Sequence, residues 1–316
     1  MSASGLAAQF TEIALAVLLA PLLTGWVNQC RAWLQNRSAP GILQPYRVLT
    51  KLFHKEVVLA HNASALFRTA PYLIFGCLAL SAAIVPTLAT DLPLNAAADA
   101  IALVGLLALA RFFISLAGMD VGTPFGTLGS RREMLVGFLA EPALLMVLFT
   151  ASLISHSSSL STIVETLAHR EFVIYPSLAF AGVAFTMVSL AENARIPIDN
   201  PATHLELTMI HEAMVLEYSA RHLALMEWAS ALKLFNYACI GFALFVPWGV
   251  STGANSPAAL AASIPLLAAK LTVAGAGLAL IETLSAKLRI FRAPEFLATA
   301  FLLAVLGLLV HLLLGT

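Results

Sequence analysis

Long apolar runs are the feature that most limits what this chain can fold into. Eight stretches of about 20 mostly apolar residues occur along it, the length that a helix needs to cross a bilayer. Of its 316 residues, 60% are hydrophobic and 11% are charged, whereas soluble domains carry about 25% charged residues. No alternating strand pattern is present, and a continuous span satisfies its backbone in lipid only as a helix.

The sequence therefore predicts an all-α integral membrane protein with eight transmembrane helices, with residues 1–316 forming a single transmembrane domain. Amphipathic and broken helices are expected in the cytoplasmic loops. The predicted spans cover residues 6–27, 70–90, 97–118, 134–154, 172–191, 229–249, 258–282 and 294–314.

Basic residues are concentrated on one side of these spans. Most of the 17 Lys and Arg residues follow odd-numbered spans, with Lys233 at the start of the sixth span counted among them. The positive-inside rule places these connections in the cytoplasm and both termini on the outer, periplasmic side of a cytoplasmic (inner) membrane. The formal net charge is zero, so no basic surface for nucleic acid is expected.

Two cytoplasmic connections are predicted to differ in structure. After Pro40 and Gly41, the first connection has the pattern of a basic amphipathic helix, which fits either a membrane-surface anchor or a docking surface for a partner. The third connection has four glycines and Pro124, which favours a tight, non-helical loop. A local cluster of ion pairs is expected around this loop, formed by Asp120, Arg131, Arg132 and Glu133.

The fifth connection, residues 192–221, is unusually rich in titratable groups for a segment between apolar runs. It carries the carboxylates Glu192, Asp199, Glu206, Glu212 and Glu217 together with His204 and His211. Prolines break the helix first, and a helix is expected to resume at Ala202 with Glu206 and Glu217 on one face.

Two interpretations of this segment remain open. Such costly groups tend to mark proton paths, and clustered carboxylates favour shared protons. Alternatively, the acids form ordinary pairs, such as Glu192 with Arg195 and Glu217 with Arg221. A zinc site is not expected, because the HExxH pattern that begins at His211 fails at Val215.

Ionisable residues inside the predicted spans include Arg111, Glu141 and Lys270. Glu141 is followed by Pro142 in the fourth span, and it either holds a proton or pairs with Arg111 of the third span. Lys270 lies in the middle of the seventh span, which ends at Glu282, and needs a partner or water. For Lys270, an ion pair and a role in a proton path are both open.

Several motifs together resemble the subunit-1 family of respiratory complex I. The closest resemblance is to the membrane anchor subunits of membrane-bound nickel–iron hydrogenases and formate hydrogenlyase (hydrogenase component C-like). The matching segments are residues 41–47 (GILQPYR), 51–56 (KLFHKE), 111–113 (RFF), 118–125 (GMDVGTPF), 141–142 (EP), 192–199 (ENARIPID), 217–219 (EYS) and 287–297 (KLRIFRAPEFL). Ala220 stands where the family usually has a glycine after EYS.

The resemblance implies a non-catalytic subunit of an oxidoreductase complex that couples redox energy to proton or cation translocation. By position it implies an acidic path formed by Glu141, Glu192, Asp199, Glu206, Glu212 and Glu217. We expect supporting roles for Arg111, Asp120, Arg195, His204, His211, Arg221, Lys270 and Glu282.

The resemblance also implies the surroundings of this subunit. No cofactor is expected in this chain, whereas partner subunits are expected to carry iron–sulfur clusters and, in hydrogenases, nickel–iron. The expected partners are hydrogenase-like large and small subunits, an iron–sulfur subunit and antiporter-like membrane subunits. The alternatives are a quinone-site subunit of an NADH-quinone oxidoreductase and a stand-alone transporter.

Overall fold

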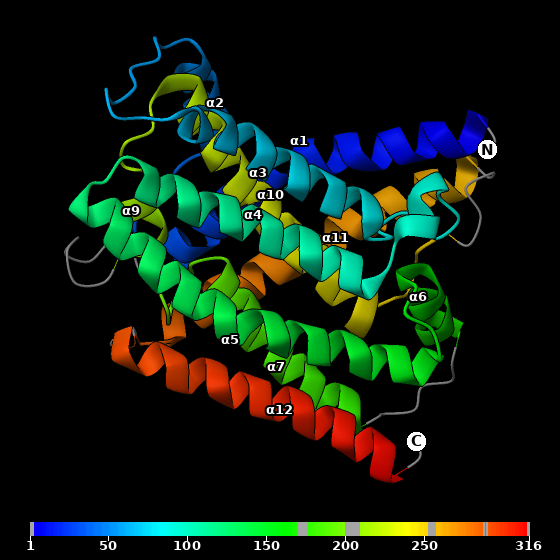
Figure 1. The fold of residues 1–316 in the computed structure, drawn as a ribbon. Coiled ribbons are helices and arrows are strands. Elements are labelled where there is room, and N and C mark those ends of the chain that lie inside the picture. Colours follow the sequence, from blue (N-terminus) through cyan, green and yellow to red (C-terminus); the bar gives the residue numbers. More distant parts are fainter. Residues whose placement is uncertain are drawn as a thin grey trace.

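Helices that run side by side make up most of the chain (Figure 1). The computed structural model describes residues 3–169, 176–199, 209–251, 257–286, 288 and 290–314. The longer helices are α1 (Ala3–Leu34), α2 (Gln44–Phe53), α3 (Ala65–Ile84), α4 (Ala100–Asp120), α5 (Pro124–Ser155), α6 (Leu160–His169), α7 (Pro176–Glu192), α10 (Ala220–Phe245), α11 (Pro257–Leu284) and α12 (Ala293–Leu314). Short helical turns are η1 (Pro93–Ala97), α9 (His211–Val215) and η2 (Ile290–Arg292).

The prediction of an all-α membrane protein is confirmed. Within the described ranges, 7 helices are long and apolar enough to cross a membrane, namely α1, α3, α4, α5, α10, α11 and α12. The predicted fifth span corresponds to α7, which has 17 described residues and so falls short of this length. The count of eight spans is therefore not confirmed, although every predicted span overlaps an apolar helix.

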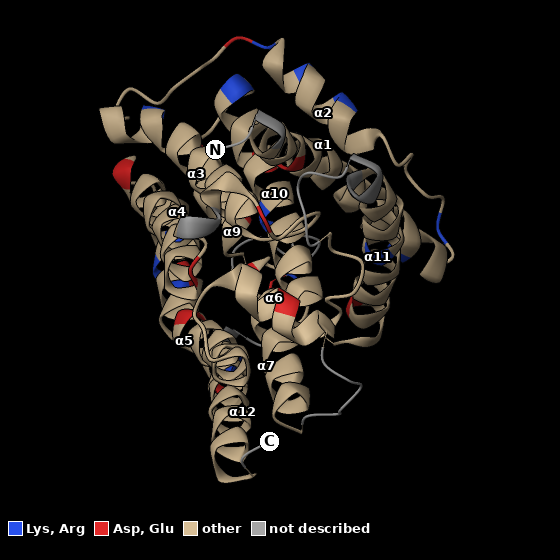
Figure 2. Cartoon of the chain, turned by 90° about the vertical axis from the view of Figure 1, so that its right-hand side faces the viewer, with Lys and Arg blue, Asp and Glu red and all other residues tan. Residues whose placement is uncertain are grey.

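The two ends of the helix bundle differ. Figure 1 shows the start of α1 and the end of α12 at the same end of the bundle, where α6 also lies, with α2 and α9 at the opposite end. Figure 2, a view along the bundle, shows that most of the ribbon carries neither acidic nor basic residues. The charges that do lie within the bundle therefore stand out from an apolar background.

Side-chain caps fix the starts of three of the long helices. The N-caps Ser64, Asp99 and Thr123 each accept a hydrogen bond from a backbone N–H in the first turn. Helices α3 and α10 are in contact, and Phe67 of α3 and Phe235 and Tyr237 of α10 are among the largest fully buried side chains.

The predicted non-helical loop after Gly118 is wrong over most of its length. Only Val121, Gly122 and Thr123 separate α4 from α5, because Thr123 caps α5 and Pro124 occupies its first turn, where proline needs no N–H partner. The glycines serve close packing instead. A Cβ on Gly129 would lie 2.8 Å from the carbonyl oxygen of Ile210, beside α9.

The predicted continuous helix through Glu217 is also wrong. The structure has α9 ending at Val215 and α10 beginning at Ala220, so Glu217 lies on a break between helices. Ala220 has a φ of 48°, in the left-handed region that favours glycine. This backbone explains why a glycine suits the position. Residues 202–208, including His204 and Glu206, lie outside the described residues.

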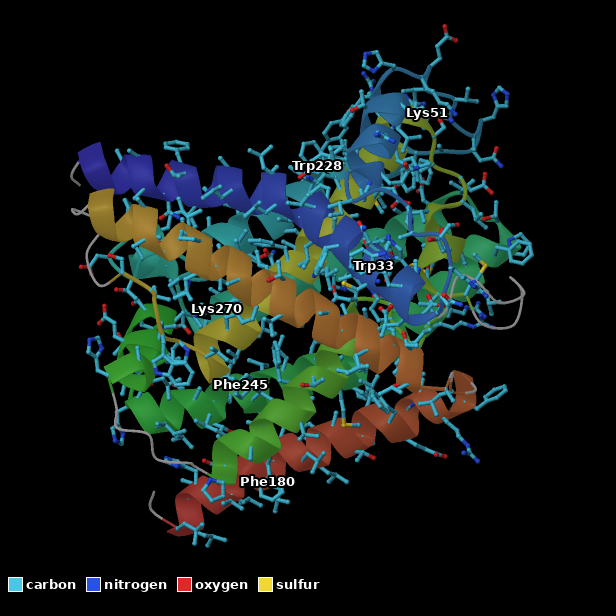
Figure 3. All side chains as sticks on the ribbon, turned by 180° about the vertical axis from the view of Figure 1, so that it is seen from behind. Trp33, Lys51, Phe180, Trp228, Phe245 and Lys270 are labelled. Atoms are coloured by element: carbon cyan, nitrogen blue, oxygen red, sulfur yellow. The ribbon has the colours of Figure 1, made fainter. Side chains whose placement is uncertain are left out.

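The basic amphipathic helix predicted after Gly41 is present as α2. It buries Leu49 and packs against α10 and α1, while Arg47 and Lys51 are exposed. Figure 3 shows Lys51 on this helix at one end of the bundle.

Candidate functional site

Arg111 is the centre of a charge cluster buried between helices. It lies on α4 with 6% of its side chain exposed. Its guanidinium contacts two carboxylates of α5, with Nε 3.3 Å from Oε1 of Glu133 and Nη1 3.0 Å from Oε1 of Glu141. Its Nη2 contacts Glu192 at the end of α7. One cation thus holds three acids from two other helices.

Lys233 of α10 adds a second cation to this cluster. Its Nζ lies 3.0 Å from Oε2 of Glu192, whose side chain is 2% exposed. We call Arg111, Glu133, Glu141, Glu192 and Lys233 the buried charge cluster. With all five groups ionised, the net charge of the cluster is −1. An unbalanced negative charge in an apolar environment favours the binding of one proton.

These contacts decide between the alternatives for Glu141 and Glu192. Glu141 pairs with Arg111, as one of its two interpretations predicted. Glu192 pairs with Arg111 and Lys233, so its predicted local pair with Arg195 is wrong. Since these partners come from distant parts of the chain, spacing along a single helix could not reveal them.

A small cavity of about 40 Å³ adjoins the buried charge cluster. Arg111, Glu133, Glu192 and Lys233 line it together with His211. A cavity needs about 10–15 Å³ to hold one water molecule. This cavity therefore has room for a few waters in contact with four members of the cluster.

A larger polar cavity of about 190 Å³ lies next to the first. Its charged and titratable lining consists of Arg31, Arg195, Asp199, His211, Glu212, Glu227 and Glu282. Both cavities are lined by Asn193, Ala194, His211 and Ser230. The larger cavity extends to Arg31, whose side chain is 37% exposed. His211 thus stands between the larger cavity and the buried charge cluster.

Asp199 holds the backbone that presents His211. Its Oδ2 accepts hydrogen bonds from the N–H groups of Ile210, at 3.1 Å, and His211, at 3.2 Å. The side chain is buried, with 3% of the residue exposed. Asp199 therefore fixes the start of α9, because it satisfies backbone donors that the first helical turn leaves free.

Glu282 joins three parts of the chain on the other side of the larger cavity. Its carboxylate lies 3.1 Å from Nη1 of Arg195 and 3.5 Å from Nη1 of Arg31. These ion pairs tie the end of α11 to α1 and to the segment after α7. Glu282 and Arg195 thus belong to the wall of the larger cavity.

Other predicted site residues lie apart from the cavities. Asp120 accepts hydrogen bonds from N–H and Oγ of Ser64, at 2.9 Å and 2.7 Å, so the predicted ion-pair cluster around it is wrong. Glu217 and Arg221 are exposed, and no ion pair within 4.0 Å joins these two described residues. Lys270 lies on α11 and donates to backbone carbonyls, so the ion-pair alternative for it is not observed in the described part of the chain.

Tyr218, just before α10, packs against α3. Its ring stacks on Phe67 with centroids 3.9 Å apart, and its hydroxyl donates to the carbonyl oxygen of Phe67 at 3.0 Å. Burial, with nearby Asp120 adding to it, raises the pKa of Tyr218 well above its usual range. The phenol therefore remains a neutral donor.

Four charged residues of the structure were not predicted as site residues. Lys233 and Glu133 belong to the buried charge cluster, whereas their sequence positions indicated only the topology and an ion pair near a loop. Glu227, on α10, lines the larger cavity, and Glu12 is buried on α1. Their position in the sequence could have identified all four, because each lies within a long, apolar helix where a charged residue is costly.

The described residues contain no group of three or more His, Cys, Asp or Glu side chains arranged as metal ligands. What they contain is a set of acids, histidine and cations around connected cavities. Such a set can bind, hold and pass protons.

Fold and site together define a multi-pass membrane protein with a buried charge cluster in its interior. Residues 8–313 match the NADH dehydrogenase family. The chain therefore belongs to this family, as the motifs predicted.

Individual relatives fall in the predicted branch of the family. The chain is 32% identical over 289 residues to formate hydrogenlyase subunit 4 of Escherichia coli (strain K12), covering 92% of this chain and 93% of the relative. It is 35% identical over 239 residues to hydrogenase-4 component C of the same strain, covering 75% of this chain and 74% of the relative.

One solved structure shares the fold. A chain in the structure of the membrane-bound sulfane sulfur reductase (MBS), an archaeal respiratory membrane complex, aligns with a TM-score of 0.80 at 19% sequence identity. The alignment covers 96% of this chain and 98% of that chain. At this identity the likeness concerns the fold alone.

Proposed function

We propose that this chain is the membrane anchor and energy-coupling subunit of a redox-driven, proton-translocating complex of the hydrogenase and complex I type. The observation that carries the proposal is the position of His211, which lines both the larger polar cavity and the small cavity of the buried charge cluster. Protons entering the larger cavity can reach Glu192 and Lys233 through water and side chains.

Glu141 provides the onward step. It contacts Arg111, yet 34% of its side chain is exposed on α5. A carboxylate that is one-third exposed on a membrane-spanning helix is costly in lipid, so this side of α5 fits a second membrane subunit that continues the polar path. Antiporter-like membrane subunits are the partners we propose for this face.

The peripheral partners belong at the opposite end from the termini, near α2 and α9. We propose that hydrogenase-like large and small subunits and an iron–sulfur subunit dock there, and that they carry the iron–sulfur and nickel–iron centres. The names of the two Escherichia coli relatives support this assignment. In this proposal the chain itself holds no redox cofactor.

A quinone site is the less favoured alternative. The larger cavity is lined by Arg31, Arg195, Glu212, Glu227 and Glu282 among others. An apolar isoprenoid tail would leave these charges without water or partners. The cavity therefore suits water and protons better than a quinone.

The experiment that tests the proposal compares Glu141→Gln with the parent chain. Everted membrane vesicles are supplied with hydrogen or formate, and proton uptake is followed by quenching of a pH-sensitive dye. We expect proton uptake per electron transferred to fall by about tenfold or more, because the variant loses a carboxylate that passes protons. Glu295→Gln, a change of an exposed glutamate on α12, is the matched control and should leave uptake unchanged.

Affinity purification in mild detergent is the accompanying measurement. Both variants and the parent chain should bring down the same partner subunits, with iron and nickel measurable in the complex. Recovery of the chain alone would contradict the anchor role and favour a stand-alone transporter. Normal proton uptake in the assembled Glu141→Gln complex would contradict the relay.

A further inference from the structure

Glu12 is a buried carboxylate that belongs to neither the buried charge cluster nor the larger cavity. It lies near the start of α1, at the end of the bundle opposite α2 and α9, and is 2% exposed. Its Oε1 accepts hydrogen bonds from the N–H groups of Thr87, at 2.6 Å, and Leu88, at 3.2 Å, and from the hydroxyl of Thr87.

The second carboxylate oxygen of Glu12 has different surroundings from the first. Among the described residues, its Oε2 is buried and has no hydrogen-bond partner. The three donors on Oε1 favour the ionised carboxylate, whereas the dry surroundings of Oε2 favour a bound proton. These opposing effects leave the proton on Glu12 exchangeable.

Thr87 connects Glu12 to a water-sized cavity. This cavity, of about 10 Å³, is lined by Thr87, Cys239, Ser263 and Lys270 among others. Its volume is about that of a single ordered water. Thr87, whose hydroxyl contacts the carboxylate, thus also lines a cavity with room for one water.

Lys270 fixes a positive charge on the far wall of this cavity. Its Nζ donates hydrogen bonds of 2.6 Å to the carbonyl oxygens of both Val246 and Trp248, just after the end of α10. Carbonyls at a helix C-terminus favour a cation. Figure 3 shows Lys270 on α11, well removed from Lys51.

Polar side chains on α10 link this site to the buried charge cluster. Lys233, Asn236 and Cys239 follow at intervals of three residues, each about 4.5 Å further along the axis. Asn236 is 1% exposed and donates to Oγ of Ser81, at 2.6 Å, while its own Oδ1 has no hydrogen-bond partner in the described structure. Along α10, the buried Asn236 therefore lies between Lys233 of the buried charge cluster and Cys239 at the cavity.

We propose that Glu12 is a second proton-binding site, which exchanges protons with the aqueous phase on the terminus-bearing side through Thr87 and the adjacent cavity. The carboxylate gains one proton to become the neutral acid and returns it to water in the reverse step. Cys239 on α10 and Lys270 on α11 are the titratable groups that share this cavity. The inference rests on the proposed proton-translocating function.

The test is Glu12→Gln in the intact complex, assayed for proton uptake in everted vesicles. The amide retains an oxygen that can accept from Thr87 and Leu88, so assembly should be preserved. We expect proton uptake per electron to fall by about tenfold or more. Glu165→Gln is the matched control, because Glu165 is a half-buried carboxylate of α6 that accepts from Thr90 at 2.5 Å yet lies outside the proposed site. It should behave like the parent chain.

Thr87→Val is the second variant, since it removes the hydroxyl while keeping the side-chain volume. Like Glu12→Gln, it should lower proton uptake per electron. Normal uptake in either assembled variant would overturn the role of Glu12. If Glu141→Gln abolishes uptake while Glu12→Gln does not, the inference fails and the proposed function stands. If neither variant affects uptake, both are wrong.

Discussion

At the scale of single residues, the charges of the buried cluster neutralise one another because several of them share partners. Glu192 is shared between Arg111 and Lys233, whereas Arg111 also has Glu133 and Glu141. Lys233 has no second carboxylate within 4.0 Å among the described residues. Loss of Glu192 would therefore leave Lys233 without a carboxylate partner among the described residues, whereas Arg111 would keep Glu133 and Glu141.

This asymmetry gives a stability prediction. Glu192→Ala should lower the free energy of unfolding by about 3–5 kcal/mol, because it leaves a buried charge uncompensated. The double change Glu192→Ala with Lys233→Met should recover part of that loss. Thermal unfolding of the purified complex in detergent measures both effects. A double variant less stable than Glu192→Ala would show that Lys233 has another partner in the assembly.

Of the ion pairs in the buried charge cluster, only the one between Arg111 and Glu141 was among the alternatives that the sequence offered. The partners Glu133 and Glu141 lie 22 and 30 residues from Arg111, on a different helix. The sequence identified Glu141, Glu192 and Asp199 as acids at costly positions, but the partner it offered for Glu192, as one of two open interpretations, was Arg195. Local spacing ranks neighbours on one helix, whereas in this bundle the choice of partner depends on which helix faces are in contact.

At the scale of elements, the contact between α5 and α9 depends on glycine. A Cβ on Gly129 would lie 2.8 Å from the carbonyl oxygen of Ile210 and 2.9 Å from Cβ of Ala213. The sequence pattern of glycines was read as a loop, yet these residues form the first turns of α5. Glycine here permits close approach of two helical segments, which outweighs its weak helix propensity.

Gly129→Ala should consequently destabilise the protein by about 1–3 kcal/mol, because the backbone of α9 must move. That movement would also displace His211, so proton uptake should fall with stability. Gly105→Ala on α4 is the control, since a Cβ there meets nothing within 4 Å. Unfolding midpoints of the two variants provide the comparison, and equal midpoints would contradict the packing argument.

At the scale of the whole molecule, the arrangement of charges predicts how the bundle lies in the membrane. The exposed Arg47 and Lys51 lie on α2, at the end of the bundle opposite the start of α1 and the end of α12. The positive-inside rule assigns this end to the cytoplasm. The proton path would then begin in the larger cavity on the cytoplasmic side and reach Glu12 near the outer side.

Cysteine labelling of intact cells tests this orientation. Asp91 is exposed beyond α3, whereas Lys51 is exposed on α2. A membrane-impermeant maleimide should label an Asp91→Cys variant, but it should label a Lys51→Cys variant only after the membrane is opened. The native Cys30, Cys77 and Cys239 are buried and give a low background. The opposite labelling pattern would show that the bundle has the reverse orientation in the membrane.

The sequence by itself determined that this chain is an all-α membrane protein with acids gathered at one edge. Span length, hydropathy and charge bias are local properties, and the bilayer acts on each segment separately. Tertiary structure alone decided that Arg111, Lys233 and Glu192 meet and that His211 lines two cavities. It also placed Glu12 beside Thr87. These contacts join helices far apart in the chain, so they follow from packing between helices.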